Sequence, residues 1–295
     1  MQALWMVLGA FFFATMGVGV KYASSSFNSF ELVLYRGLIS IVFLAGVLRG
    51  NGISLRTPVP WMHAWRSVVG GAALGAWFFA IAHLPLATAM TLNYMSGIWV
   101  AAFIVGGALL MGKSERQGPL LLTVLTGFAG VVLTLRPTLD QNQLFAGLVG
   151  LLSGMCASLA YLQVTALGRA GEPVGRTVFY FAIGTAVVGG AGSLVVGFTP
   201  WAAVSWQALA WLVPIGVFAS LGQWCMTRAY SRGHTLVVAS LQYSGIVFAA
   251  LYSLVLFGDD MPWSAWSGIG LIVASGVAAT FLRERALPDT PAEDH

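Results

Sequence analysis

Two short clusters of uncharged polar residues interrupt long apolar stretches of this chain, Asn93 to Ser96 and Gln242 to Ser244. Amide and hydroxyl groups in such surroundings bind either a neighbouring helix or a solute, because burying an amide without a partner costs about 1–3 kcal/mol. For any one residue a hydrogen bond between helices is as reasonable as contact with a solute. For the set as a whole, a shared aqueous cavity is the better explanation.

Aromatic residues extend this set. Residues 74–77 and 221–224 repeat the pattern Leu-Gly-x-Trp, and this equivalence favours cavity lining by Trp77 and Trp224 over contact with lipid. We predict that a small-molecule substrate is bound by Trp77, Asn93, Tyr94, Tyr161, Gln163, Tyr180, Gln223, Trp224, Gln242, Tyr243 and Ser244.

Few ionisable residues lie in apolar sequence, and the candidates for a gate or an ion pair are Lys21, Glu31, Arg36 and His83. Charges inside a membrane are costly and mark functional sites. Most of these residues fall near segment ends, however, where long side chains reach water. We expect a structural Glu31–Arg36 or Lys21–Glu31 pair at the external mouth rather than a gate or proton site, and a structural role for His83.

The apolar segments lack the residues of a catalytic site. They contain no His-Glu-x-x-His motif, no plausible Ser and His pair and no pair of acids, and Asp259 and Asp260 fall in a predicted loop. Cys156 and Cys225 lie inside apolar segments and fit small core residues. We therefore expect no enzymatic activity, no catalytic residue, no metal and no cofactor. A channel is also disfavoured, because the scattered polar groups are too few for a continuous pore.

The elements that must position these residues are helices in lipid. Charged residues make up 8% of the chain and hydrophobic residues 58%, whereas soluble domains carry about 25% charged residues. A span needs about 20 apolar residues, and backbone in lipid must satisfy its own hydrogen bonds. We predict ten helical spans, at 3–22, 29–48, 65–82, 87–111, 118–135, 145–168, 177–196, 208–228, 234–257 and 264–282. The first is expected to be retained, because no signal-peptide pattern precedes it.

The basic residues predict the orientation of these spans. One side carries eleven, Arg49, Arg56, Arg66, Lys113, Arg116, Arg169, Arg176, Arg228, Arg232, Arg283 and Arg285, and the other carries Lys21 and Arg136. Cytoplasmic loops are enriched in Lys and Arg, so both termini are expected in the cytoplasm of a bacterial inner-membrane protein. The net charge of +4 is then loop charge, and no nucleic-acid partner is expected.

The two halves of the chain repeat each other. Besides the Leu-Gly-x-Trp motifs, Ser96-Gly97 corresponds to Ser244-Gly245, Gly112 to Gly258, and Tyr35 to Tyr180, at a nearly constant offset. Five spans in each half place the second half upside down relative to the first, an arrangement associated with secondary transporters. We predict a first repeat at 1–138, a second at 139–285 and a disordered cytoplasmic tail at 286–295.

Ten spans as five plus five, both termini inside and a Gly closing each fourth helix resemble the drug/metabolite transporter superfamily, of the EamA type. The resemblance covers the chain except its tail. The aromatic-rich regions 161–181 and 223–252 are most similar to the YddG group of amino-acid exporters. The resemblance implies an all-α membrane transporter and export of amino acids.

The predicted cavity is aromatic and neutral. No Lys or Arg is expected at its centre to bind a phosphorylated sugar, and the first span has no acid for a lipophilic cation. We expect export of neutral or zwitterionic amino acids, aromatic or large aliphatic and including threonine-like or methionine-like ones. The alternative is export of other small metabolites or drugs. Two half-bundles would rock about the site in a monomer in lipid, and uniport and proton antiport both stay open.

Overall fold

The computed structural model describes residues 4–110, 118–135, 141–232, 238, 241–259 and 262–286. All regular elements within these ranges are helical, as predicted: α1 (Leu4–Ala23), α2 (Ser29–Gly50), α3 (Pro60–His83), α4 (Leu86–Asn93), α5 (Ser96–Leu110), α6 (Gly118–Leu135), α7 (Gln141–Arg169), α8 (Val174–Val196), η1 (Trp201–Ala203), α9 (Trp206–Arg232), α11 (Ser244–Tyr252), η2 (Ser253–Phe257) and α12 (Trp263–Ala286). The ten predicted spans are each represented. The predicted closing Gly112 and the tail beyond Ala286 lie outside the described residues.

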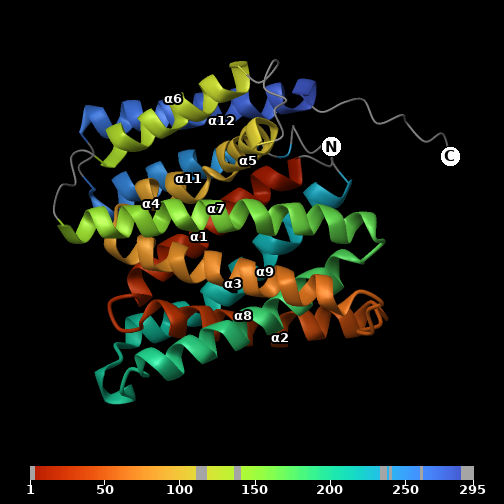
Figure 1. Ribbon diagram of the computed structural model, residues 1–295. Coiled ribbons are helices and arrows are strands. Elements are labelled where there is room, and N and C mark those ends of the chain that lie inside the picture. Colours follow the sequence, from red (N-terminus) through yellow and green to blue (C-terminus); the bar gives the residue numbers. More distant parts are fainter. Residues whose placement is uncertain are drawn as a thin grey trace.

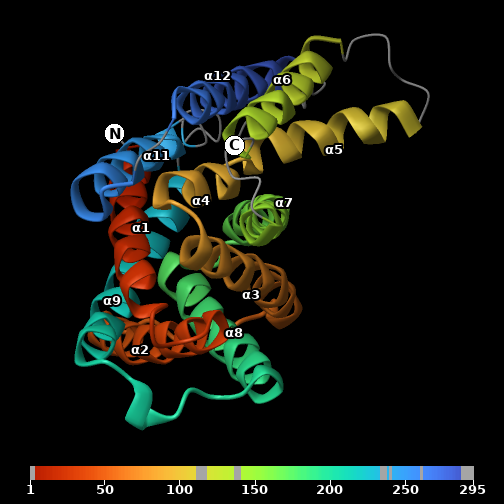
Figure 2. The same ribbon diagram turned by 90° about the vertical axis from the view of Figure 1, so that its left-hand side faces the viewer.

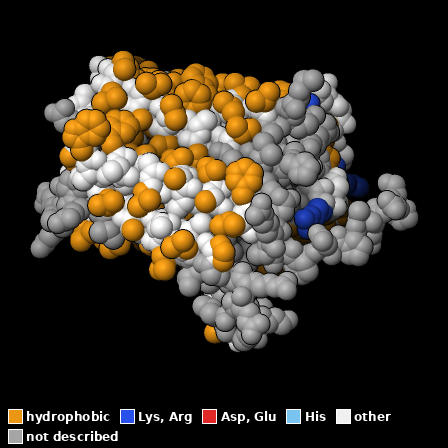
Figure 3. All heavy atoms as spheres, turned by 90° about the horizontal axis from the view of Figure 1, so that it is seen from above, with side chains coloured by type: hydrophobic (Ala, Val, Ile, Leu, Met, Phe, Trp, Pro, Cys, Tyr) orange, Lys and Arg blue, Asp and Glu red, His pale blue; other side chains and the backbone are white. Residues whose placement is uncertain are grey.

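The described helices suit a lipid environment. Six of them, α1, α2, α3, α7, α8 and α9, are long and apolar enough to cross a membrane. Large apolar side chains are exposed on the outside, including Leu110, Val195 and Trp263. Hydrophobic side chains are spread over the face above α6 and α12, and the Lys and Arg side chains visible there lie toward one end (Figure 3). Exposed apolar surface on this scale is typical of a membrane interface.

Helices from the two halves pair with each other (Figures 1 and 2). The most extensive contacts join α1 with α9, α3 with α7, α2 with α8, and α6 with α12. Exchanging the two halves converts the α1–α9 pair into the α7–α3 pair and leaves the other two pairs unchanged. The packing therefore has the approximate two-fold relation of inverted five-helix repeats, which confirms the predicted fold class. The boundaries at 138 and 285 stay predictions.

Glycine permits the closest of these approaches. A Cβ atom added to Gly37 would lie 2.7 Å from the backbone nitrogen of Ala186, and one added to Gly189 would overlap the backbone of Leu34. Small residues let helix backbones approach in membranes, where packing rather than hydrophobic burial drives association. The α2–α8 contact, at the edge of the bundle opposite α6 and α12 (Figures 1 and 2), therefore depends on these two positions.

The fourth predicted span is not one continuous helix. It consists of α4 and α5, which are separated at Tyr94 and Met95 and point in different directions (Figure 2). All eight residues of α4 are buried, and a Cβ added to Gly154 of α7 would lie 2.5 Å from the carbonyl oxygen of Leu92. A break in a helix at membrane depth is tolerated where protein surrounds the freed backbone. The break places Asn93 and Tyr94 in the interior.

Candidate functional site

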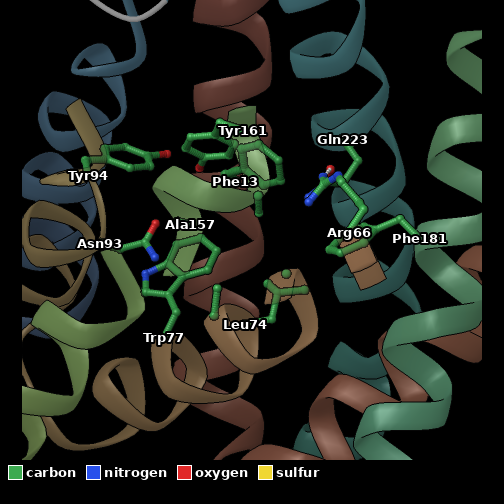
Figure 4. Close-up of a pocket in the computed structure, with 13 residues that line it drawn as sticks. Phe13, Arg66, Leu74, Trp77, Asn93, Tyr94, Ala157, Tyr161, Phe181 and Gln223 are labelled. Carbon is green, nitrogen blue, oxygen red and sulfur yellow. Dashed lines mark hydrogen bonds between the residues drawn. The ribbon is translucent and has the colours of Figure 1, made fainter. Parts of the chain in front are cut away.

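A cavity lies between helices of both halves, where the α4–α5 break faces α1, α3, α7, α8 and α9 (Figure 4). Its lining is mostly apolar and aromatic, with a few polar groups: Phe13, Arg66, Gly70, Ala73, Leu74, Trp77, Asn93, Tyr94, Ala157, Ala160, Tyr161, Phe181 and Gln223. Ligand sites generally combine apolar walls with a few placed polar groups. Five of the eleven predicted binding residues line this cavity: Trp77, Asn93, Tyr94, Tyr161 and Gln223.

Arg66 corrects the expectation of a neutral cavity. A third span that begins at 65 predicts that this residue belongs to the loop charges, but α3 begins at Pro60 and carries Arg66 inside the bundle. Its side chain is 3% exposed. One terminal guanidinium nitrogen donates to Gln223 Oε1 at 3.3 Å, and the guanidinium carbon lies 4.1 Å from the centre of the Phe181 ring. A fixed positive charge therefore forms part of the wall (Figure 4).

A second arginine lies near the same aromatic ring. Arg36 is 2% exposed, and its guanidinium carbon lies 5.6 Å from the centre of the Phe181 ring. Its Nη1 donates to Thr185 Oγ1 at 3.4 Å. The predicted Glu31–Arg36 pair is therefore not formed, because α2 directs Arg36 toward α8 instead of along its own axis. Cation–π contact supplies part of the stabilisation that an acid would otherwise give.

Gln242 organises the polar side of the cavity from one layer behind it. It accepts from Tyr230 Oη at 3.0 Å and donates to Ser96 Oγ at 3.4 Å and to Tyr161 Oη at 3.5 Å. The rings of Tyr161 and Tyr230 stack at 5.7 Å. Gln242 thus belongs to the support of the cavity rather than to its surface, and it joins the two predicted polar clusters.

Three polar groups on the cavity wall keep hydrogen-bonding capacity. Asn93 donates through Nδ2 to Ser153 Oγ at 3.1 Å, which leaves its amide oxygen as a possible acceptor. The indole nitrogen of Trp77 and the hydroxyl of Tyr94 have no partner within the described part of the chain. Buried polar groups are normally satisfied, so these groups are available to water or to a bound solute.

The other predicted binding residues do not line the cavity. Trp224 packs against the cluster of Leu44, Leu48 and Phe179 between α2 and α8. Tyr180 stacks on His63 at 4.6 Å and donates to the carbonyl of Leu55. Three residues do not line the cavity: Gln163, Tyr243 and Ser244. These placements arise because the helices are apolar all round, so sequence alone does not indicate which face points inward.

The remaining ion-pair candidates have structural partners. Glu31 caps α2 by accepting from the backbone nitrogen of Asn28 and also accepts from Thr199, at 2.8–2.9 Å. Lys21 donates to the carbonyl of Leu84 at 2.9 Å and lies 3.7 Å from Asp259. The predicted Lys21–Glu31 pair is therefore not formed either. His83 is exposed and stacks on Phe79.

A buried ionic cluster that the sequence did not indicate lies near the other end of α3. His63 Nε2 lies 3.4 Å from Glu172 Oε2, and both side chains are at most 2% exposed. Glu172 also accepts from Thr57 Oγ1 at 2.6 Å and pairs with Arg176 at 3.3 Å. The cluster ties the start of α3 to the α7–α8 connection, and Arg176 balances the charge of Glu172.

Two sequence signals could have located the missed residues. Proline is favoured in the first turn of a helix, so Pro60 marks the true start of α3 and places Arg66 nearly two turns inside it. The spacing of Asn28 and Glu31 is that of a capping box, which the structure contains. Phe13 and Phe181 carry no signal that separates cavity lining from lipid contact.

Comparison with known proteins identifies the class. Residues 1–136 match the EamA-like transporter family. The chain is 33% identical over 279 residues to the pseudopaline exporter CntI of Pseudomonas aeruginosa, which covers 93% of this chain and 91% of that protein. It is 26% identical over 279 residues to a riboflavin transporter of Rhizobium johnstonii, covering 93% and 89%.

Other matches agree. An S-adenosylmethionine uptake transporter of Rickettsia felis is 24% identical over 288 residues, covering 96% of this chain and 93% of that protein. One solved structure has a TM-score of 0.66 at 19% identity and covers 96% of this chain and 98% of its own, which supports the fold alone. The relatives transport different solutes, so the cargo and the similarity to the YddG group stay predictions. This chain is a multi-pass membrane transporter, not an enzyme, and it belongs to the EamA-like transporter family.

Proposed function

We propose that this transporter exports neutral amino acids with aromatic or large apolar side chains across a bacterial inner membrane. The observation that carries the proposal is the cavity, which is lined by five aromatic side chains and a few hydrogen-bonding groups. Phe13, Trp77, Tyr161 and Phe181 would contact an apolar side chain, while Asn93 and Tyr94 would bind polar groups of the solute. Export of other metabolites remains the alternative. Efflux of lipophilic cations is disfavoured, because Arg66 would repel them.

Alternating access fits the size of the cavity. The volume in which the centre of a water molecule can move inside it is about 40 Å³. One water needs roughly 10–15 Å³ on the same measure. The cavity therefore holds only a few waters, and it must widen before an amino acid can enter. The transporter therefore needs helix movement around the site, and an inverted repeat allows similar movements toward either side.

The packing supports movement of mixed helix pairs rather than of whole halves. Each of the four most extensive contacts joins one helix from each half, so rocking spans one to five against six to ten would separate all four. We infer that pairs such as α1–α9 and α3–α7 move as units. The repeats at 1–138 and 139–285 are then units of duplication, and a monomer is sufficient for transport.

The proposal is tested with purified protein in liposomes, by counterflow of labelled phenylalanine, threonine and tetraphenylphosphonium with and without a pH gradient. Flux of phenylalanine without flux of the cation is expected, and its dependence on the gradient would distinguish proton antiport from uniport. Flux of tetraphenylphosphonium alone would replace the proposal with drug efflux.

A further inference from the structure

We propose that the cavity contains a carboxylate-binding site, in which Arg66 supplies the charge and Gln223 holds its guanidinium in place. The inference rests on the proposed function and refines it, since it assigns the group of the cargo that the transporter requires. Cargo with an aromatic or large apolar body but no carboxylate would be rejected.

The first argument is the charge balance at the cavity. Arg66 is 3% exposed and borders the cavity, and none of the ion pairs among the described residues gives it an acidic partner. Its Nε is buried without a hydrogen bond within the same residues. A buried charge without a counter-ion is strongly unfavourable, and an anionic cargo would remove that cost when it binds.

The second argument is that the buried acid beside His63 is already engaged. Glu172 accepts from Thr57 and pairs with His63 and Arg176, although His63 lies only one helical turn from Arg66 on α3. Arg36 adds a second positive charge near the same Phe181 ring, 5.6 Å from its centre. The region around Phe181 therefore carries two buried guanidinium groups, and only Arg66 reaches the cavity.

The third argument is geometric. Gln223 accepts from one terminal nitrogen of Arg66 at 3.3 Å, and Phe181 covers one side of the guanidinium. These two contacts fix the plane of the guanidinium group of Arg66 and leave its other N–H donors available to the cavity. A planar guanidinium matches the two oxygens of a carboxylate, and the aromatic rings across the cavity can accommodate the rest of the solute (Figure 4).

The test uses the full-length protein in detergent and labelled 3-phenylpropionate, an aromatic carboxylate that is not an amino acid. Phenethylamine, which lacks the carboxylate, and phenyl phosphate serve as competitors. The wild type is expected to bind phenylpropionate, and Arg66→Gln is expected to weaken binding by about 10- to 100-fold, the range for hydrogen bonds to a charged group. Arg228→Gln is the matched control, since Arg228 lies over Trp5 and outside the cavity.

Gln223→Glu is the second variant, because it keeps the size of the side chain and places a carboxylate beside Arg66. It should preserve the fold and abolish phenylpropionate binding, because the new carboxylate would occupy Arg66. If the protein binds phenylpropionate but does not transport phenylalanine, the amino-acid proposal is refuted and the carboxylate site is supported. The inference is overturned if no carboxylate binds, if Arg66→Gln binds phenylpropionate like the wild type, or if phenethylamine or phenyl phosphate binds more tightly.

Discussion

Trp77 and Trp224 end the same motif in the two repeats, yet their surroundings differ. Trp77 is 4% exposed, borders the cavity and meets Phe13 edge to face at 6.4 Å. Trp224 fills the separate apolar cluster between α2 and α8, next to Gly175. Duplication therefore preserved the position of the residue along its helix, but the neighbouring helices decide what that position contacts.

The polar residues follow the same rule. The Tyr94 hydroxyl borders the cavity, whereas the Tyr243 side chain points at Gly276 of α12. The residue 147 positions after Arg66, the offset between the two tryptophans, is the exposed Val213. The first repeat thus supplies most of the chemistry of the cavity, and the second supplies Gln223 together with much of the supporting wall.

The largest difference between the repeats is expected from the tryptophans. Trp77→Ala should lower the apparent affinity of transport by about 30-fold or more, as for a central aromatic anchor. Trp224→Ala should lower the Tm and leave the KM unchanged, because its contacts lie outside the cavity. Trp77→Phe controls for loss of packing and should retain most transport. Equal KM values for the two alanine variants would contradict the asymmetry.

The contact that joins the repeats is tested by two adjacent glycines of α8. Gly189→Ala should cost about 1–3 kcal/mol of stability, because the added methyl meets the backbone of Leu34. Gly190→Ala is the control, since its added Cβ would lie 3.7 Å from the Leu34 side chain, an ordinary contact. Thermal unfolding in detergent measures both, and equal losses would show that α2 and α8 can move apart freely.

A smaller effect separates the two tyrosines. Tyr94→Phe removes a cavity hydroxyl and should weaken transport by about 2- to 10-fold, the range for one hydrogen bond. Tyr243→Phe should leave transport unchanged, because that hydroxyl is buried without a partner in the described residues. Uptake rates at several phenylalanine concentrations distinguish them, and a larger defect in Tyr243→Phe would reverse the comparison.

The smallest effect is expected at the Lys21–Asp259 pair, where both side chains are about one fifth exposed. Lys21→Met and Asp259→Asn, alone and combined, should show a coupling energy of about 0–1 kcal/mol that decreases with salt. A coupling energy well above this range would mean that the pair contributes substantially to holding the helices together at the end where Lys21 and Asp259 lie.

Sequence predicted the helices better than the cavity, for physical reasons. Span length and hydrophobicity are local properties, so all ten segments were found, while the break at Tyr94 depends on Gly154 of a distant helix. Arg66 was misassigned through a helix start five residues too late, measured from 65 to Pro60. Trp224 was misassigned because an apolar helix presents no polar face to orient it.

The pairing of α1 with α9 also has a consequence for the time course of biogenesis. About 180 residues separate the end of α1 from the start of α9. At about 5–20 residues per second, the first helix waits roughly 10–40 s in the bilayer for its main partner. During that interval its buried surface, with Gly9 and Gly17, is exposed to lipid and to the insertion machinery, so the nascent chain is most vulnerable to proteolysis before its second half emerges.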